Sequence, residues 1–105
     1  MNNWMQFRMR SKWLKANLQL VILLALRRQP MSKWELLDEI YSRSGLLPEE
    51  SEFKRIIILL LDGNFVEVLS EESQPRMSIN TRGLELLSEL ESLQYKYFES
   101  ANAPG

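Results

Sequence analysis

The stretch Leu47–Asn80 constrains the fold most, because its local signals occur in an order that few folds share. The tripeptide Pro48-Glu49-Glu50 suits the first turn of a helix, since proline needs no amide partner there and carboxylates favour the positive end of the helix dipole. Gly63 ends that helix. The intervening residues, Phe53 among them, have apolar side chains at helical spacing, so we expect a helix that buries one face.

Two short strands are predicted after this helix. Residues 65–69 alternate apolar and polar side chains with a period of two, residues 70–75 are rich in turn formers, and residues 77–80 form the second strand. A helix, a hairpin and a further helix in this order are typical of a winged helix. In that fold the helix before the hairpin is the one presented to DNA, and the hairpin is the wing beside it.

A long helix is predicted upstream, from Ser11 to Arg28. Its second half, Leu20–Leu26, is apolar on all sides, so it must be buried on more than one side. A domain of this size can seldom cover such a helix alone, and we therefore expect a second subunit to pack on it. The predicted dimer contacts on this helix are Leu20, Leu23 and Leu24.

A second helix begins at a capping box. The Ser32 hydroxyl can accept a hydrogen bond from the amide of Glu35, while the Glu35 side chain reaches back to the amide of Ser32. The helix continues to Gly45, which we expect to be a left-handed cap.

The last helix is predicted to start at Thr81 as its cap. It has an apolar seam at spacings of four, three and four, which supplies the other predicted dimer contacts: Leu86, Leu90, Leu93 and Tyr97.

The predicted fold is thus mainly α with a small β-hairpin, a winged helix-turn-helix with an additional C-terminal helix. We expect an N-terminal arm over residues 1–10, a winged-helix domain with a C-terminal dimerisation helix over 11–100, and a frayed tail over 101–105. The arm either extends the first helix or pairs with a partner.

Composition argues against an enzyme. The 105 residues include no cysteine and no histidine, so thiolate or imidazole metal ligands and most hydrolytic triads cannot be built. Paired carboxylates and a glycine-rich phosphate loop are not found either. We therefore expect a single-domain binding protein with no metal and no cofactor.

The sequence predicts neither a membrane span nor an export signal. The longest uninterrupted apolar run, Leu20–Leu26, has seven residues, whereas a span requires about 20. Residues 1–10 lack the continuous apolar core of a secretion signal. We expect a soluble, cytoplasmic protein.

Charge is distributed unevenly along the chain. The first 34 residues hold seven of the 13 basic side chains and none of the 14 acidic ones. Such a segment is expected to meet something anionic, either nucleic acid or the acidic remainder of this chain or of a partner.

The segment LVILLALRRQPMSKWELLDEI resembles the first two helices of PadR-like winged-helix regulators, which are joined by a short turn containing proline. Phe53 near the start of the third helix, and Gly63 before the wing, are also similar to that family. The family enters its final helix with Thr-x-x-Gly, whereas here Gly83 follows Thr81 by two positions. The resemblance covers roughly residues 14–93. It implies a dimeric DNA-binding transcription regulator, with the third helix in the major groove and the wing on the phosphate backbone.

The residues expected to bind double-stranded DNA are the basic and polar groups of these elements. They are Ser51, Lys54 and Arg55 on the third helix, Arg76 on the wing, and Arg8, Arg10, Lys12 and Lys15 near the N-terminus. Carboxylates at positions 49, 50, 52 and 62, and at 71 and 72 in the wing, oppose phosphate binding. We therefore expect most of the affinity to come from the basic N-terminal segment.

A second function stays open at this point. Ile58 and Leu59 are predicted on the outward face of the third helix, where an exposed apolar pair is typical of a protein contact. The alternative is a winged-helix subunit of a larger complex that binds a protein partner and does not read DNA directly.

Overall fold

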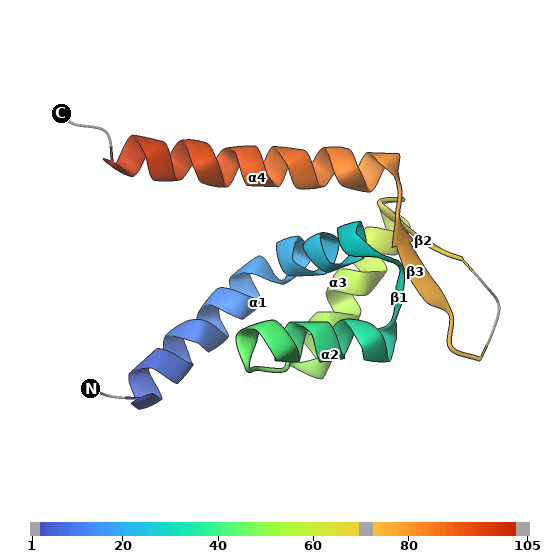
Figure 1. Cartoon of the computed structure of the whole chain (residues 1–105), viewed down its shortest axis with the longest axis horizontal. Coiled ribbons are helices and arrows are strands. Elements are labelled where there is room, and N and C mark those ends of the chain that lie inside the picture. Colours follow the sequence, from blue (N-terminus) through green and yellow to red (C-terminus); the bar gives the residue numbers. More distant parts are fainter. Residues whose placement is uncertain (1–2, 70–72, 103–105) are drawn as a thin grey trace.

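The structure, a computed structural model, describes residues 3–69 and 73–102. Its elements follow one another as α1 (Asn3–Arg28), β1 (Met31–Ser32), α2 (Lys33–Ser44), α3 (Glu50–Asp62), β2 (Val66–Val68), β3 (Arg76–Ile79) and α4 (Thr81–Asn102). Figure 1 shows α4 along one side of the molecule, α2 along the other, and the hairpin projecting from one end. The mainly helical winged-helix fold predicted from the sequence is confirmed.

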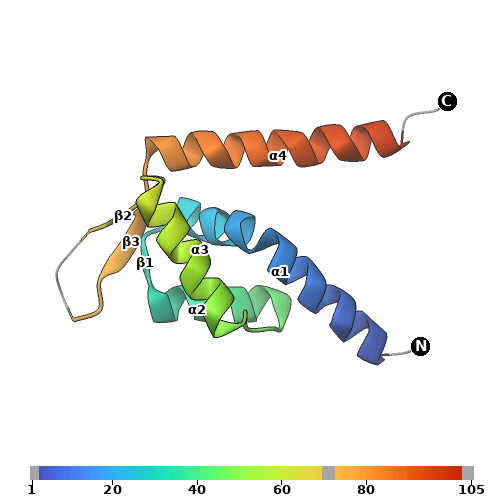
Figure 2. The ribbon, with the colours of Figure 1, turned by 180° about the vertical axis from the view of Figure 1, so that it is seen from behind.

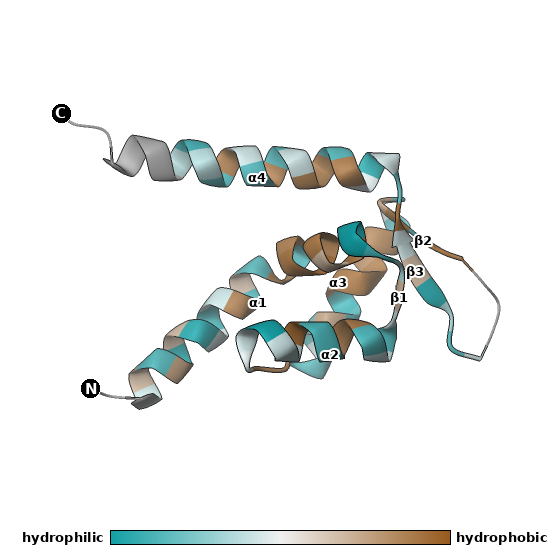
Figure 3. Ribbon diagram, viewed as in Figure 1, coloured by the Kyte–Doolittle hydropathy of each residue, from teal (hydrophilic) through white to brown (hydrophobic). Residues whose placement is uncertain are grey.

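The second half of α1 is the centre of the core. Its side chains Leu18, Ile22, Leu23 and Leu26 are almost completely buried, and α1 contacts α2, α3, α4 and β3. Views from the front and from behind agree that α1 lies between α4 and the pair formed by α2 and α3 (Figures 1 and 2). The hydropathy colouring shows that the apolar half of α1 is the part that lies between these helices (Figure 3).

Two of the predicted dimer contacts are already buried within the single chain. Leu20 and Leu23 are 7% and 0% exposed, so the chain itself covers them. The physical reason is that α1 packs against three helices and a strand of the same chain. A pattern that is apolar on all sides therefore does not by itself require a second subunit.

Residues 3–10 extend α1, which is one of the two alternatives that the sequence left open. The break in the helix comes later, at Asn17, whose backbone angles are non-helical (φ −115°, ψ 15°). The Asn17 side-chain amide donates to the carbonyl of Trp13 at 2.9 Å, a local bond that competes with the helical ladder. Beyond this kink the N-terminal half of α1 diverges from α4 (Figures 1 and 2).

The predicted capping box and left-handed cap of α2 are both confirmed. The Glu35 amide donates to the Ser32 hydroxyl at 3.2 Å, and the Ser32 amide donates to the Glu35 carboxylate at 3.1 Å. Gly45 has a φ of +74°, and its amide donates to the carbonyl of Tyr41.

The two faces of α3 also follow the sequence. Phe53, Ile56 and Leu60 are buried in the core. Lys54, Arg55, Ile58 and Leu59 are exposed on the outer face.

The sheet contains one strand more than the sequence predicted. Its order is β1-β3-β2, all antiparallel, with Met31 opposite Met77 and Val66 opposite Ile79. Strand β2 is shorter than the predicted 65–69, and β3 begins and ends one residue before the predicted 77–80. The predicted tip of the wing at residues 70–72 lies outside the described residues. The added strand β1 ties the start of α2 to the wing.

Asn80, and not Thr81, caps α4. The Asn80 side-chain oxygen accepts from the amide of Gly83 at 2.8 Å, and its side-chain nitrogen donates to the carbonyl of Asn64 at 2.7 Å. Thr81 is already the first helical residue. Both residue types can cap a helix, but only Asn80 can also donate to the turn before β2. At the other end α4 reaches Asn102, two residues into the predicted tail, and residues 103–105 lie outside the described residues.

Gly83, in the first turn of α4, gives a prediction about the contact between α4 and the residues before β2. A Cβ atom at this position would lie 2.2 Å from the carbonyl oxygen of Phe65. Replacing glycine by alanine in a helix usually stabilises by about 1 kcal/mol, but here we expect Gly83→Ala to destabilise by about 1–3 kcal/mol, because the wing must move. Urea unfolding measures the difference, with Ser88→Ala on the exposed surface of α4 as the control. Equal stability of the two variants would contradict this packing.

Candidate nucleic-acid interface

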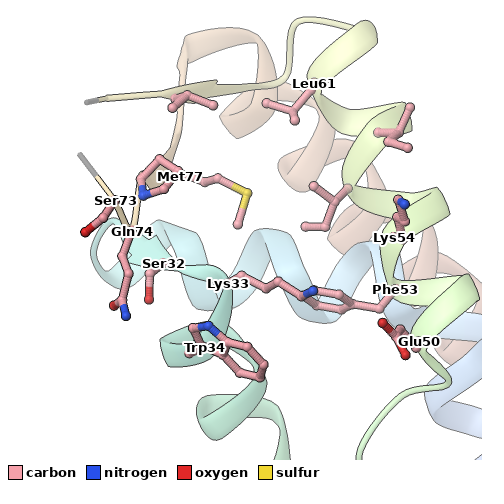
Figure 4. Close-up of a pocket in the computed structure, with 14 residues that line it drawn as sticks. Ser32, Lys33, Trp34, Glu50, Phe53, Lys54, Leu61, Ser73, Gln74 and Met77 are labelled. Carbon is pink, nitrogen blue, oxygen red and sulfur yellow. The ribbon is translucent and has the colours of Figure 1, made fainter. Parts of the chain in front are cut away.

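A groove separates α3 from the wing and is closed at one end by the start of α2. Its volume is about 500 Å³. Figure 4 shows Trp34 and Lys33 from α2, Phe53 and Lys54 from α3, and Met77 from the wing around it. Apolar side chains dominate the lining: Trp34, Phe53, Ile57, Ile58, Leu61, Val68, Pro75 and Met77. We call this surface the α3–wing groove.

The three predicted DNA contacts on α3 are exposed, and two of them already have partners. The Arg55 guanidinium pairs with the Glu52 carboxylate at 3.0 Å, and this hydrogen bond lowers the pKa of Glu52 and raises that of Arg55. The Ser51 hydroxyl donates to Glu49 at 2.9 Å. Lys54 borders the groove and makes no ion pair within the described part of the chain.

The cation of the wing is paired as well. Arg76 lies 3.4 Å from the carboxylate of Glu35. The backbone hydrogen bond from Ser32 is the main cause that lowers the pKa of Glu35, and the charge of Arg76 adds to it. The capping box of α2 and the wing are therefore electrostatically linked.

The basic N-terminal segment meets the start of α3 only in part. Lys15 shares a small cavity with Glu49 and Glu52, and its charge helps to lower the pKa of Glu52. An Arg10 guanidinium nitrogen comes within 3.8 Å of the position that a Cβ would take at Gly45, in the link before α3. Lys15 thus borders the N-terminal end of α3, and Arg10 lies near the end of α2, before the link to α3.

Arg8 and Lys12 are exposed on the N-terminal half of α1. The guanidinium of Arg8 lies over the Trp4 ring, 5.3 Å from its centroid. Figure 1 places this end of α1 at the opposite end of the molecule from the wing. Within one chain, the structure does not bring Arg8 and Arg76 together.

The remaining predicted dimer contacts differ in exposure, and on α4 the exposure increases toward the C-terminal end. Leu24 of α1 and Leu86 and Leu90 of α4 are half-buried, whereas Leu93 and Tyr97 are 62% and 79% exposed. The exposure increases where α1 is kinked. The Gln94 side chain donates to the Asn17 side chain at 3.3 Å, and from Asn17 toward its N-terminus α1 turns away from α4. The outer half of the seam is therefore uncovered in the single chain.

Sequence reasoning missed Trp34 and Lys33 as groove residues. Trp34 is exposed, and the Lys33 ammonium lies 5.4 Å from its ring centroid. Trp34 precedes the buried Leu36 by two positions, which puts it on the other side of α2. That spacing could have identified it.

The described side chains, those of residues 4–69 and 73–97, include no group of three or more acidic residues that could hold a metal ion. None of the helices in these ranges is long and apolar enough to span a membrane.

Several solved structures with this arrangement of elements are transcription factors or regulators by name. A PadR-like transcription factor from Bacteroides fragilis has a TM-score of 0.74 at 18% identity, over 90% of this chain and 96% of that one. A transcriptional regulator from Clostridium thermocellum has a TM-score of 0.73 at 10% identity, over 86% and 93%. A PadR family transcription regulator from Clostridium difficile has a TM-score of 0.67 at 14% identity, over 81% and 93%.

These likenesses define the class of fold, a winged helix with a long C-terminal helix. More particularly, the chain has the PadR-like form of that fold, as its sequence resemblance implied. No protein-family model and no curated protein sequence matches the chain.

The capping box of α2, whose Glu35 also pairs with Arg76, gives a prediction about how the stability of the chain depends on pH. Because the pKa of Glu35 is lowered in the folded chain from its ordinary value of 4.5, its contribution to stability is complete above that value and is lost as the pH falls through the lowered pKa. Glu35→Ala should therefore lower the melting temperature near neutral pH, and the difference from the unmodified chain should shrink below about pH 4. Asp38→Ala, exposed on the same helix, is the control. A difference that stays constant down to about pH 3 would contradict the assignment.

Proposed function

We propose that the chain is a cytoplasmic, homodimeric transcription regulator of the PadR-like kind that binds duplex DNA with α3 and the wing. One observation carries the proposal. The outer face of α3 is exposed beside the wing, in a fold that is shared with several solved structures named as transcription factors or regulators. The position of α3 suits entry into the major groove, and Arg76 on the wing suits a phosphate contact.

The ion pairs on this face do not prevent DNA binding. Arg55 and Arg76 are exposed, and the carboxylates that they contact are at least partly exposed, Glu35 more than Glu52. Such exposed pairs are worth about 0–1 kcal/mol, so a phosphate oxygen that offers a charge-assisted hydrogen bond can replace the carboxylate. The carboxylates that are released then lie close to the DNA. We therefore expect weak binding that depends steeply on salt.

Cations next to α3 support the phosphate contacts. Lys15 borders the N-terminal end of α3, which is the end that a recognition helix points toward the bases, and Arg10 lies near Gly45, in front of the link to α3. Lys54 extends from the outer face without an ion pair in the described ranges. Phosphate contacts by these groups position the protein, and the third helix supplies preference for a sequence.

The dimer is supported by the exposed apolar seam of α4 and by charge. Leu93 and Tyr97 are uncovered beyond the kink of α1. The N-terminal half of α1 carries exposed aromatic side chains and the exposed cations Arg8 and Lys12, whereas α4 has exposed acidic residues at 85, 89 and 91. A second copy that lays its α4 against this half of α1 would cover both surfaces and bring opposite charges together.

The dimer prediction concerns Leu93. Light scattering of the unmodified chain should give twice the 12.4 kDa mass of the monomer at micromolar concentration. Leu93→Asp should shift the equilibrium toward the monomer, because a carboxylate without a partner would be buried at the interface. Ser92→Asp, which adds the same charge at an exposed neighbouring position, should have little effect. A single 12.4 kDa species across this range would remove the dimer from the proposal.

The DNA prediction concerns Glu52. Glu52→Gln removes a carboxylate from α3 and frees Arg55, so affinity for mixed-sequence duplex should rise severalfold in fluorescence anisotropy. Asp38→Asn changes the net charge equally on α2 and should leave the affinity almost unchanged. Lys54→Ala should weaken binding and flatten its salt dependence.

Two outcomes would contradict this proposal. One is the absence of binding by the unmodified chain at about 50 mM salt, where phosphate contacts are strongest. The other is an equal response to Glu52→Gln and Asp38→Asn, since the effect would then come from net charge and not from α3.

A further inference from the structure

The α3–wing groove has a chemistry that DNA does not require. Its floor is made by Phe53 and Met77, both buried, and by the half-buried Ile57 and Leu61. Phosphate oxygens need hydrogen-bond donors or cations, and these side chains offer neither. Water held against such a lining is released when an apolar group enters.

Exposed apolar side chains continue the lining out to the rims. Ile58 of α3 is 46% exposed, and Trp34 of α2 and Val68 of β2 are also exposed. They come from three separate elements, and all three line the α3–wing groove. A contiguous apolar surface of this kind is typical of a protein contact, whereas single exposed apolar residues are not.

The charges at the groove indicate the character of the occupant. Lys33 and Lys54 border it from opposite elements, and neither makes an ion pair in the part of the chain that the structure describes. The nearby arginines Arg55 and Arg76 are each paired with a glutamate. Glu50 is the single acidic side chain among the described lining residues. Lys33 and Lys54, which make no ion pair there, thus favour an occupant with carboxylates beside its apolar contacts.

We propose that the α3–wing groove binds an amphipathic segment of a partner protein, with apolar side chains in the groove and carboxylates against Lys33 and Lys54. Helix-in-groove recognition has this form, since an amphipathic helix inserts anchors spaced at i, i+3, i+4 and i+7 into an apolar groove. The groove lies between the two elements proposed to hold DNA. The partner segment and DNA therefore compete for one face, and this competition alone rests on the proposed function.

A synthetic peptide tests the docking directly. The probe is a fluorescein-labelled amphipathic helix with leucines at i, i+3, i+4 and i+7 and glutamates on the flanks, and its control has the same composition with the leucines dispersed. Fluorescence anisotropy with the full chain should show saturable binding of the first peptide. The dispersed peptide should bind at least about tenfold more weakly, a difference of about 1.4 kcal/mol.

A matched pair of variants locates the site. Ile58 and Leu59 are adjacent on α3, similar in size and both about half exposed, at 46% and 51%, but only Ile58 lines the groove. Ile58→Glu should weaken peptide binding about tenfold or more, because it places a carboxylate among apolar groups and opposite the acidic flank. Leu59→Glu should change it less than about twofold. Lys33→Ala combined with Lys54→Ala should weaken binding and reduce its salt dependence.

The outcomes separate this proposal from DNA binding. Lack of binding by the first peptide, equal binding of the two peptides, or equal effects of Ile58→Glu and Leu59→Glu would overturn the docking site. Displacement of bound peptide by unlabelled duplex DNA supports the shared face, whereas simultaneous binding of both would overturn the competition. If the peptide binds at Ile58 and DNA does not bind at all, the docking site stands and the DNA proposal fails.

Discussion

Burial of the apolar half of α1 is the interaction on which the rest of the structure depends. Leu18, Ile22, Leu23 and Leu26 are almost completely removed from water, and each fully buried aliphatic side chain of this kind contributes about 1.5–3 kcal/mol. Because α1 contacts α2, α3, α4 and β3, this one segment fixes the positions of all three other helices. The outer face of α3 is exposed as a consequence, since its inner face is committed to α1.

The parts of the fold that the sequence predicted correctly depend on neighbours along the chain. The capping box at Ser32, the left-handed Gly45 and the two faces of α3 follow from local hydrogen bonding and helical periodicity. The errors depend on distant segments. Strand β1 exists only because it pairs with β3. An apolar pattern such as that of Leu20 and Leu23 says that a side chain is covered, but it does not say by which chain.

The candidate site was predictable to a similar extent. The exposure of Lys54 and Arg55, and the Glu52 partner one helical turn from Arg55, can be read from spacing. The pair between Arg76 and Glu35 could not, because tertiary packing brings the wing to the start of α2. The groove combines residues from α2, α3 and the wing, so no single stretch of sequence describes its apolar character.

The central claim is that the face formed by α3 and the wing is the binding face of this protein. Amide chemical shifts of the 15N-labelled chain, followed by NMR during titration with duplex DNA, test it most directly. The account predicts that the largest changes fall on α3 around Ser51 and Lys54 and on β3 at Arg76, with small changes along α4. Changes confined to the N-terminal half of α1, with the amides of α3 and β3 unmoved, would contradict it.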